Sequence, residues 1–369
     1  MARLFAFGQL MQGTAAPSDR VPRTTADPVS LPSKVVDDSV IRTALAVHLG
    51  RKFGGEVAIA DFARKSSGFS WITYSFVARR PSSPDRKLIL RVGPPNGLFA
   101  PYSVLPQVNA LQSLAGTAVP VPALVSFDEE GAEIGFPFFV CAHVEGEVPA
   151  PWASSGLSQD HRRNIAGQFV AILGELHKFD WRGTSLAASD VAGEARGEVR
   201  AIRVWRASLA RPTARYYPLL DWGGRWLEEN CPPPPRRTVV HGDYRIGNFL
   251  EQEQKITAIL DWELTHFGDP HEDLAWALMP TFNAGSRKFY GVVERDEVID
   301  LYQRVSGIPI SGKSLAFYEA FALYQAAAIQ MCAVHAFEVD RFNDMRMAVM
   351  ASQMASIVRA FDRALEAAA

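Results

Sequence analysis

The hydrophobic periodicity of the chain changes once, near residue 144, and this change restricts the fold more than any other feature. Before it, apolar and polar residues alternate in short runs at 57–62, 71–80 and 87–93. Such alternation predicts β-strands with one buried face. Beyond it, apolar residues recur at helical spacing, first at 159–178 and then through most of 271–369. We therefore expect a small β-rich lobe followed by a larger, mainly helical lobe.

Turn-forming residues divide the β-rich part further. The patterns predict helices at 40–53 and 104–115, and a strand pair at 123–127 and 136–144. The first residues form a Pro-, Ser- and Thr-containing extension. The expected organisation is an extension at 1–39, the β-rich lobe at 40–143 and the helical lobe at 144–369.

Charge and cysteine content argue against several classes of protein. The 38 Lys and Arg residues nearly balance the 40 Asp and Glu residues, so no overall field attracts nucleic acid or an anionic membrane, and neither is expected as a partner. Cys141, Cys231 and Cys332 form no disulfide framework, and the N-terminus lacks a signal-peptide core, which together favour the cytoplasm. The apolar stretch 318–337 contains polar residues and is interpreted as a buried helix rather than a membrane span.

A polar constellation follows two short β runs in the helical part. Asp243 and Asn248 come after the run at 237–240, and Asp261 ends the run at 255–260. The intervening EQEQ is turn-like, so we expect these two runs to form a hairpin that brings the three side chains to one edge. Carboxylate and amide oxygens suit Mg²⁺, and phosphoryl transfer needs such a metal site and an orienting carboxylate.

The stretches HGDYRIGN, ILDWE and GDPHEDLAW resemble the aminoglycoside phosphotransferase and choline kinase-like family, whose members are relatives of the protein kinases. The residues of these stretches are most similar to those of the branch associated with acyl-CoA dehydrogenases and hydroxyacyl-CoA kinases. The resemblance covers about residues 40–340. It implies an α+β, bilobal protein-kinase-like fold that binds ATP between its lobes, with ATP and Mg²⁺ as cofactors.

The resemblance also implies roles for single residues of the second lobe. Asp243 matches the catalytic aspartate that orients the acceptor hydroxyl or accepts its proton. Asn248 and Asp261 match the metal ligands. Arg245 takes the place of a lysine that contacts the γ-phosphate, and its planar guanidinium suits that role. His241 is either a general base or a structural support of the loop, and we favour the support.

Other acidic residues near this constellation have two interpretations each. Asp269 and Asp273 are either acids in the site or residues that cap the next helix and brace the catalytic loop, and we favour the second. Glu263 either takes part in metal binding or lies outside the metal site, and the sequence leaves both open.

In the first lobe, the stretch 66–76 matches the loop that covers the phosphates, which makes Ser67, Gly68 and Phe69 candidate nucleotide contacts. With one glycine the motif is weak, and a plain hairpin turn is the alternative. Arg91 matches the residue that holds the α- and β-phosphates; the alternative is an exposed arginine at a strand end.

Two further nucleotide contacts follow from the resemblance. The family carries a glutamate on the next helix to pair with the residue at Arg91, and this chain has Gln107 there, which could still form a weaker hydrogen bond with Arg91. The segment from Cys141 to His143 is expected to form the hinge between the lobes and to meet the adenine through its backbone.

Residues 307–314 (GIPISGKS) satisfy the phosphate-loop pattern G-x-x-x-x-G-K-[ST]. The pattern is meaningful between a strand and a helix, but here it follows a helical segment, and Pro309 removes one backbone N–H. We expect a helix-to-helix turn with Ser314 near a cap.

The phosphate acceptor is expected to be a small-molecule alcohol. The helices after residue 315 present apolar and aromatic side chains that suit an uncharged or lipid-like alcohol. The resemblance implies that this alcohol could be a hydroxyacyl-CoA. An aminoglycoside or other antibiotic is the alternative acceptor. A nucleotide-binding pseudokinase is the alternative from another class, supported by Gln107 and the poor glycine loop. The larger side chains of this region are expected to lie mostly in the core: Phe317, Tyr318, Phe321, Tyr324 and Met331.

Overall fold

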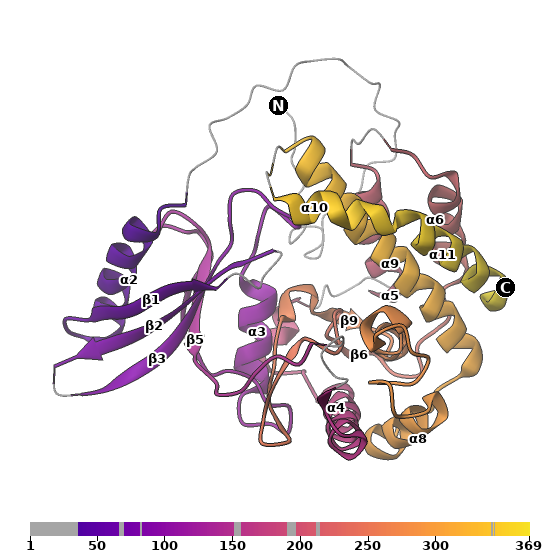
Figure 1. Ribbon diagram of the computed structural model, residues 1–369, viewed down its shortest axis with the longest axis horizontal. Coiled ribbons are helices and arrows are strands. Elements are labelled where there is room, and N and C mark those ends of the chain that lie inside the picture. Colours follow the sequence, from indigo (N-terminus) through magenta and orange to yellow (C-terminus); the bar gives the residue numbers. More distant parts are fainter. Residues whose placement is uncertain are drawn as a thin grey trace.

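The computed structural model describes residues 36–65, 70–81, 83–150, 156–189, 197–211, 215–340, 342 and 344–369. The candidate loop residues Ser67, Gly68 and Phe69, and nearly all of the 1–39 extension, lie outside this part of the chain. Figure 1 shows a sheet with a helix against it, next to a larger helical body. The expected order of a β-rich part followed by a mainly helical part is confirmed.

The first lobe contains a five-stranded antiparallel sheet with the order β1-β2-β3-β5-β4. Its strands are β1 (Ala58–Lys65), β2 (Ile72–Arg80), β3 (Ser83–Val92), β4 (Leu124–Asp128) and β5 (Phe138–Ala142). In β3, Leu88, Leu90 and Val92 pack in one apolar cluster with helix α2 (Asp38–Phe53). Because strand side chains alternate, Arg91 lies on the opposite face of the sheet and reaches the helical lobe.

Helices lie against both faces of this sheet. α2 follows Asp37, whose carboxylate accepts hydrogen bonds from the amides of Ser39 and Val40, and it ends at Gly54 with φ 72°. On the other face lies α3 (Leu105–Leu114), which buries Gln107 and its apolar side chains in the main core. The sheet thus separates the outer core of the first lobe, which contains α2, from the core shared with the second lobe, which contains α3.

The helical lobe is arranged around α9 (Gly312–Glu338), against which α5, α7, α10 and α11 pack. Among the described residues, α9 alone is long and apolar enough to cross a membrane, but 72% of its most apolar window is buried inside the protein. The predicted buried helix is therefore confirmed, and all five side chains expected in the core are buried. The other helices are α4 (Gln159–Lys178), α5 (Gly197–Leu209), α6 (Pro218–Asn230), α7 (His271–Ala277), α8 (Arg295–Ser306), α10 (Met345–Met350) and α11 (Met354–Ala368). Short 3-10 turns lie between the larger elements: η2 (Ser185–Ser189), η3 (Trp262–Leu264), η4 (Pro280–Asn283) and η5 (Ala351–Gln353).

Two small antiparallel ladders carry the polar constellation, and their pairing differs from the prediction. β7 (Phe249–Gln252) pairs with β8 (Lys255–Ile259), whereas β6 (Thr238–Val240) pairs with β9 (His266–Gly268). The expected hairpin between 237–240 and 255–260 is thus wrong. The reason is local: Glu253 and Gln254 have φ 51° and 61° and close a two-residue turn, so β8 pairs with the strand immediately before it.

Candidate active site

The loop after β6 is shaped by one glycine and one buried carboxylate. Gly242 has φ 82°, and a Cβ at this position would lie 2.6 Å from the Leu264 carbonyl oxygen. The amides of His241 and Gly242 donate to the Asp273 carboxylate over 2.7 and 2.9 Å. Asp273 belongs to α7 and also contacts His177 at 3.2 Å. These contacts support the interpretation that Asp273 braces the loop.

His241 uses both ring nitrogens inside the loop. Its Nε2–H donates to the Leu260 carbonyl oxygen at 2.9 Å, and its Nδ1 accepts from the Asp243 amide at 3.2 Å. Burial lowers the pKa of His241, against the influence of nearby carboxylates, which favours this neutral tautomer. A ring with both nitrogens engaged has no free position for substrate, so the geometry supports the structural interpretation.

Three donors orient the Asp243 carboxylate. Oδ1 accepts from Trp276 Nε1 at 2.7 Å and from Arg245 Nε at 2.9 Å. Oδ2 accepts from Asn248 Nδ2 at 2.6 Å. Sequence reasoning assigned no role to Trp276. The spacing in the sequence could have indicated a role, because Trp276 lies about one helical turn after Asp273. The two side chains therefore lie on the same side of α7, the helix that braces the loop.

Asn248 contacts this carboxylate, and Asp261 lies near Arg245, which also pairs with Asp243, so the structure supports the predicted convergence of three oxygen-bearing side chains. The Leu260 amide donates to the Asn248 carbonyl oxygen at 2.9 Å, which joins the two segments. Asn248 Nδ2 is engaged with Asp243, and Asp261 Oδ1 accepts from Arg91 Nη2 at 2.9 Å. Among the described residues, no donor reaches Asn248 Oδ1 or Asp261 Oδ2. Amide and carboxylate oxygens of this kind fit a hard cation such as Mg²⁺.

The Arg91 guanidinium is held by carboxylates of the helical lobe. Burial by itself would lower the pKa of Arg91, but Asp261 and Glu263 raise it above its ordinary value. In turn, Arg91 and Arg245 keep the pKa of Asp261 below its ordinary value against the effect of burial. The Arg91 side chain thus stays charged beside the candidate metal ligands.

The expected hydrogen bond between Gln107 and Arg91 is not formed. Both Gln107 Nε2 and Arg91 Nε are buried without a partner in the part of the chain that the structure describes. The Arg91 guanidinium pairs with Asp261 instead, because a carboxylate binds a cation more strongly than a neutral amide does.

Glu263 contacts the first lobe. Its Oε1 accepts from Ser70 Oγ and its Oε2 from Trp71 Nε1, each at 2.7 Å. Burial and the neighbouring Asp261 raise the pKa of Glu263 to about 8. Ser70 and Trp71 precede β2 within the stretch that matches the phosphate-covering loop. Glu263 therefore connects this stretch to η3, the short helix that begins directly after the candidate ligand Asp261.

The candidate hinge lies where the chain leaves β5 for the helical lobe. Cys141 is buried, and burial raises the pKa of its thiol to about 12. The amide of His143 donates to the Lys87 carbonyl oxygen at 3.1 Å. This N–H is therefore occupied at the end of the ladder between β3 and β5 and is not free to meet an adenine.

Residues 307–314 form the connection between α8 and α9, as expected. Gly307 ends α8 with φ 68°, and Ser311 Oγ accepts from the Ser314 amide at 3.3 Å. The capping residue is therefore Ser311, and Ser314 supplies the capped amide. The segment is not flanked by a strand, so it lacks the setting of a phosphate loop.

Comparison with known proteins identifies relatives of this chain. Residues 71–308 match the model of the phosphotransferase enzyme family. Acyl-CoA dehydrogenase family member 10 of Mus musculus is 28% identical over 259 residues, which are 66% of this chain and 24% of that protein. The chain thus spans about a quarter of the length of this relative.

Solved structures share the fold. A Ralstonia eutropha protein classed with the aminoglycoside phosphotransferases superposes with a TM-score of 0.70 at 22% identity, over 88% of this chain and 98% of that one. The streptomycin-ATP-APH(2")-IIa ternary complex superposes with a TM-score of 0.52 at 15% identity, over 77% and 88% of the two chains. At these identities the likeness establishes a kinase-like fold.

Proposed function

This chain belongs to the phosphotransferase enzyme family, whose members are small-molecule kinases, and we propose that it transfers the γ-phosphoryl group of Mg-ATP to an uncharged or lipid-like alcohol. One observation carries the proposal. The Asp243 carboxylate is oriented by three donors, while open oxygens of Asn248 and Asp261 lie beside it. This is the donor set that phosphoryl transfer requires.

Asp243 orients the acceptor hydroxyl and takes up its proton. The acceptor oxygen then bonds to the γ-phosphorus as the bond to the β-phosphate oxygen breaks, and ADP leaves. Orientation supplies most of the effect, because this reaction needs positioning and charge stabilisation more than covalent help from the protein. His241, with both nitrogens engaged, keeps the loop in shape.

Residues from both lobes provide the nucleotide and metal contacts. The unpartnered nitrogens of Arg91 and Gln107 suit phosphate oxygens, and Asn248 Oδ1 with Asp261 suits Mg²⁺. When bound, Mg²⁺ neutralises the charge that develops on the transferred phosphoryl group. The complex of a structural neighbour with ATP supports the choice of nucleotide.

The surroundings of Asp243 favour an apolar or anionic acceptor over a polycation. The Arg245 guanidinium lies 5.2 Å from the ring centroid of Phe282, and the Phe282 and Trp276 rings are 5.0 Å apart. The guanidinium repels a polyamine, and the two aromatic rings accommodate a lipid-like chain. The relative in the acyl-CoA dehydrogenase group supports a hydroxyacyl-CoA as this acceptor, while structural neighbours that bind aminoglycosides keep an antibiotic as the second candidate.

The test measures ADP formation from Mg-ATP with hydroxyacyl-CoAs, simple alcohols, choline, macrolides and aminoglycosides. We expect an acceptor-dependent rate with a hydroxyacyl-CoA that falls about 10²–10⁴-fold in Asp243→Asn, with nucleotide affinity nearly unchanged. An aminoglycoside-dependent rate would instead establish the antibiotic kinase. ATP binding without transfer to any acceptor would favour the pseudokinase. An equal rate in Asp243→Asn would remove Asp243 from its role.

A further inference from the structure

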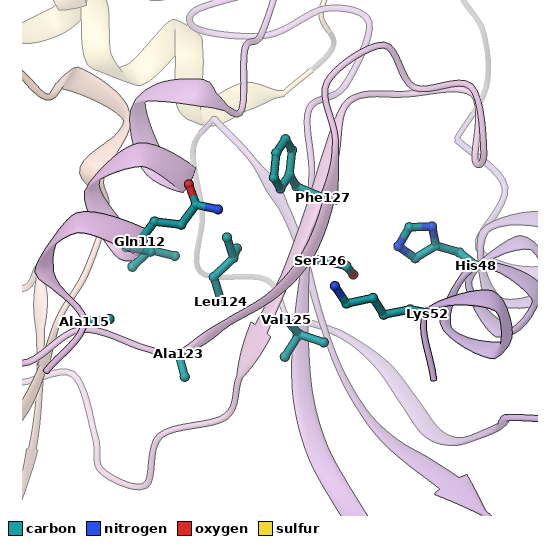
Figure 2. A pocket seen from close by; sticks show the side chains of 10 residues that line it. His48, Lys52, Gln112, Ala115, Ala123, Leu124, Val125, Ser126 and Phe127 are labelled. Carbon is teal, nitrogen blue, oxygen red and sulfur yellow. The ribbon is translucent and has the colours of Figure 1, made fainter. Parts of the chain in front are cut away.

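A cavity of about 550 Å³ lies on the first lobe, away from the constellation around Asp243. It crosses β4, the edge strand of the sheet, between the C-terminal ends of α2 and α3 (Figure 2). This volume lies in the range of small-molecule sites. None of the residues assigned to nucleotide, metal or acceptor binding lines it.

One end of the cavity presents polar groups without partners. Ser126 is 8% exposed, and neither its Oγ nor the buried Nε2 of His48 has a hydrogen-bond partner in the described part of the chain. Figure 2 shows the side chains of Ser126, Lys52 and His48 directed into the same space on one side of β4. Buried polar atoms are nearly always paired in native proteins, so their position at a cavity wall indicates a bound polar group.

The charge at this end is positive. Lys52 forms no ion pair among the described residues. The neighbouring carboxylate, Glu133, lies 3.7 Å from His48 Nδ1 but already pairs with Arg51 at 2.7 Å. The Lys52 charge is therefore left unmatched, and an anion complements it.

The other end is apolar. Figure 2 shows Leu124 and Phe127 on the side of β4 that faces α3, near Gln112. Leu111 of α3 also lines this side, and Phe127 is 39% exposed despite its size. A ligand that fills the whole cavity therefore has an anionic head and a short apolar body.

We propose that this cavity, the β4 pocket, binds a small organic anion. Its carboxylate or phosphate head contacts Lys52, Ser126 and His48, and its apolar chain lies against Leu124 and Phe127. α3 packs both against β4 and against η3, so the occupant touches a helix that reaches the segment after Asp261. Binding is independent of the proposed kinase reaction, so its test can fail without affecting that proposal.

Isothermal titration calorimetry on the full chain tests the β4 pocket with hexanoate, hexyl phosphate, 1-hexanol and inorganic phosphate. We expect hexanoate or hexyl phosphate to bind at least about tenfold more tightly than the neutral alcohol and the chainless anion, because both ends of the pocket are then filled. The tighter of the two anions identifies the head group.

Variants locate the binding. Lys52→Gln and Ser126→Ala should each weaken the anion's affinity about tenfold, since each loses one contact to a charged group. Lys313→Gln, an exposed lysine at the start of α9, is the matched control and should leave affinity unchanged. Thermal unfolding midpoints verify that the variants are folded. Absence of binding, equal binding of 1-hexanol, or full affinity in Lys52→Gln would each overturn the proposal.

Discussion

At the scale of single residues, the side chains around Asp243 restrict its carboxylate to one orientation. Donors reach both oxygens, from Trp276 and Arg245 on Oδ1 and from Asn248 on Oδ2. Rotation would break hydrogen bonds to a carboxylate, which are stronger than hydrogen bonds between neutral groups. In the proposed reaction, the indole of Trp276 would therefore act on the acceptor hydroxyl only through Asp243, as a positioning residue.

We expect Trp276→Phe to lower kcat about 10- to 100-fold, because a hydrogen bond to a charged group contributes about 1.5–3 kcal/mol. The KM for Mg-ATP should change less than about twofold, since the remaining ring still packs on Phe282. Steady-state kinetics with the identified acceptor measures both constants. Trp226→Phe on α6 is the matched control. A wild-type kcat in Trp276→Phe would show that Asp243 is oriented without the indole.

At the scale of elements, the seven-residue helix α7 organises the catalytic loop. All of its residues are buried, and Asp273 holds the amides after β6. Before α7, Asp269 accepts from the amide of His271, the first residue of the helix, at 2.8 Å, although Pro270 takes the N-cap position and no side chain caps from there. Glu272 pairs with His266 at the start of β9 over 3.2 Å. These contacts hold β6, β9 and α7 in one arrangement.

The pair of His266 and Glu272 makes stability depend on pH. Burial by itself would lower the pKa of His266, but Glu272 raises it from 6.5 to about 9. Because the folded pKa exceeds the unfolded one, this stabilisation is complete below about pH 6.5 and is lost as the pH rises through about 9. We expect the free energy of unfolding to fall in this window by up to about 1 kcal/mol per pH unit.

Urea unfolding between pH 6 and pH 9 measures this dependence. His266→Gln removes the titrating group and should flatten the curve in this window, whereas unfolding at pH 9 should differ less between the two proteins than at pH 6. The same pH dependence in His266→Gln as in the unaltered chain would assign the effect to other groups.

At the scale of the whole molecule, the site exists only because the two lobes meet. Arg91 contacts Asp261 across 170 residues of sequence, and Ser70 and Trp71 contact Glu263 across more than 190. The Arg91 guanidinium also lies 5.9 Å from the ring centroid of Trp71. Contacts across the lobe interface thus hold β3 and the start of β2 against the segment that carries Asp261.

We expect Glu263→Ala to raise the KM for Mg-ATP about tenfold and to change kcat less than about threefold, because it loses two hydrogen bonds that position the segment before β2. Glu263→Gln retains an acceptor and should recover part of the loss. Glu297→Ala, which removes an exposed partner of Arg163, is the control. A KM unchanged in Glu263→Ala would mean that the nucleotide does not depend on this contact.

Several features of the fold and the site were determined by the sequence alone. The alternation in 87–93 places Arg91 opposite its apolar neighbours, and the polar loops after short β runs hold Asp243 and Asn248. These features follow from side-chain periodicity and backbone chemistry, which act over a few residues. They indicate both the order of the lobes and the residues that converge.

The tertiary structure alone decided which groups became partners. β8 pairs with β7 rather than with β6, the indole of Trp276 reaches Asp243, and Asp261 holds Arg91 where Gln107 was expected. A local pattern specifies the face on which a side chain lies. The partner of that side chain depends on groups distant in sequence, which compete for the same contact. Burial and charge settle that competition, since a buried cation selects the nearest carboxylate over an amide.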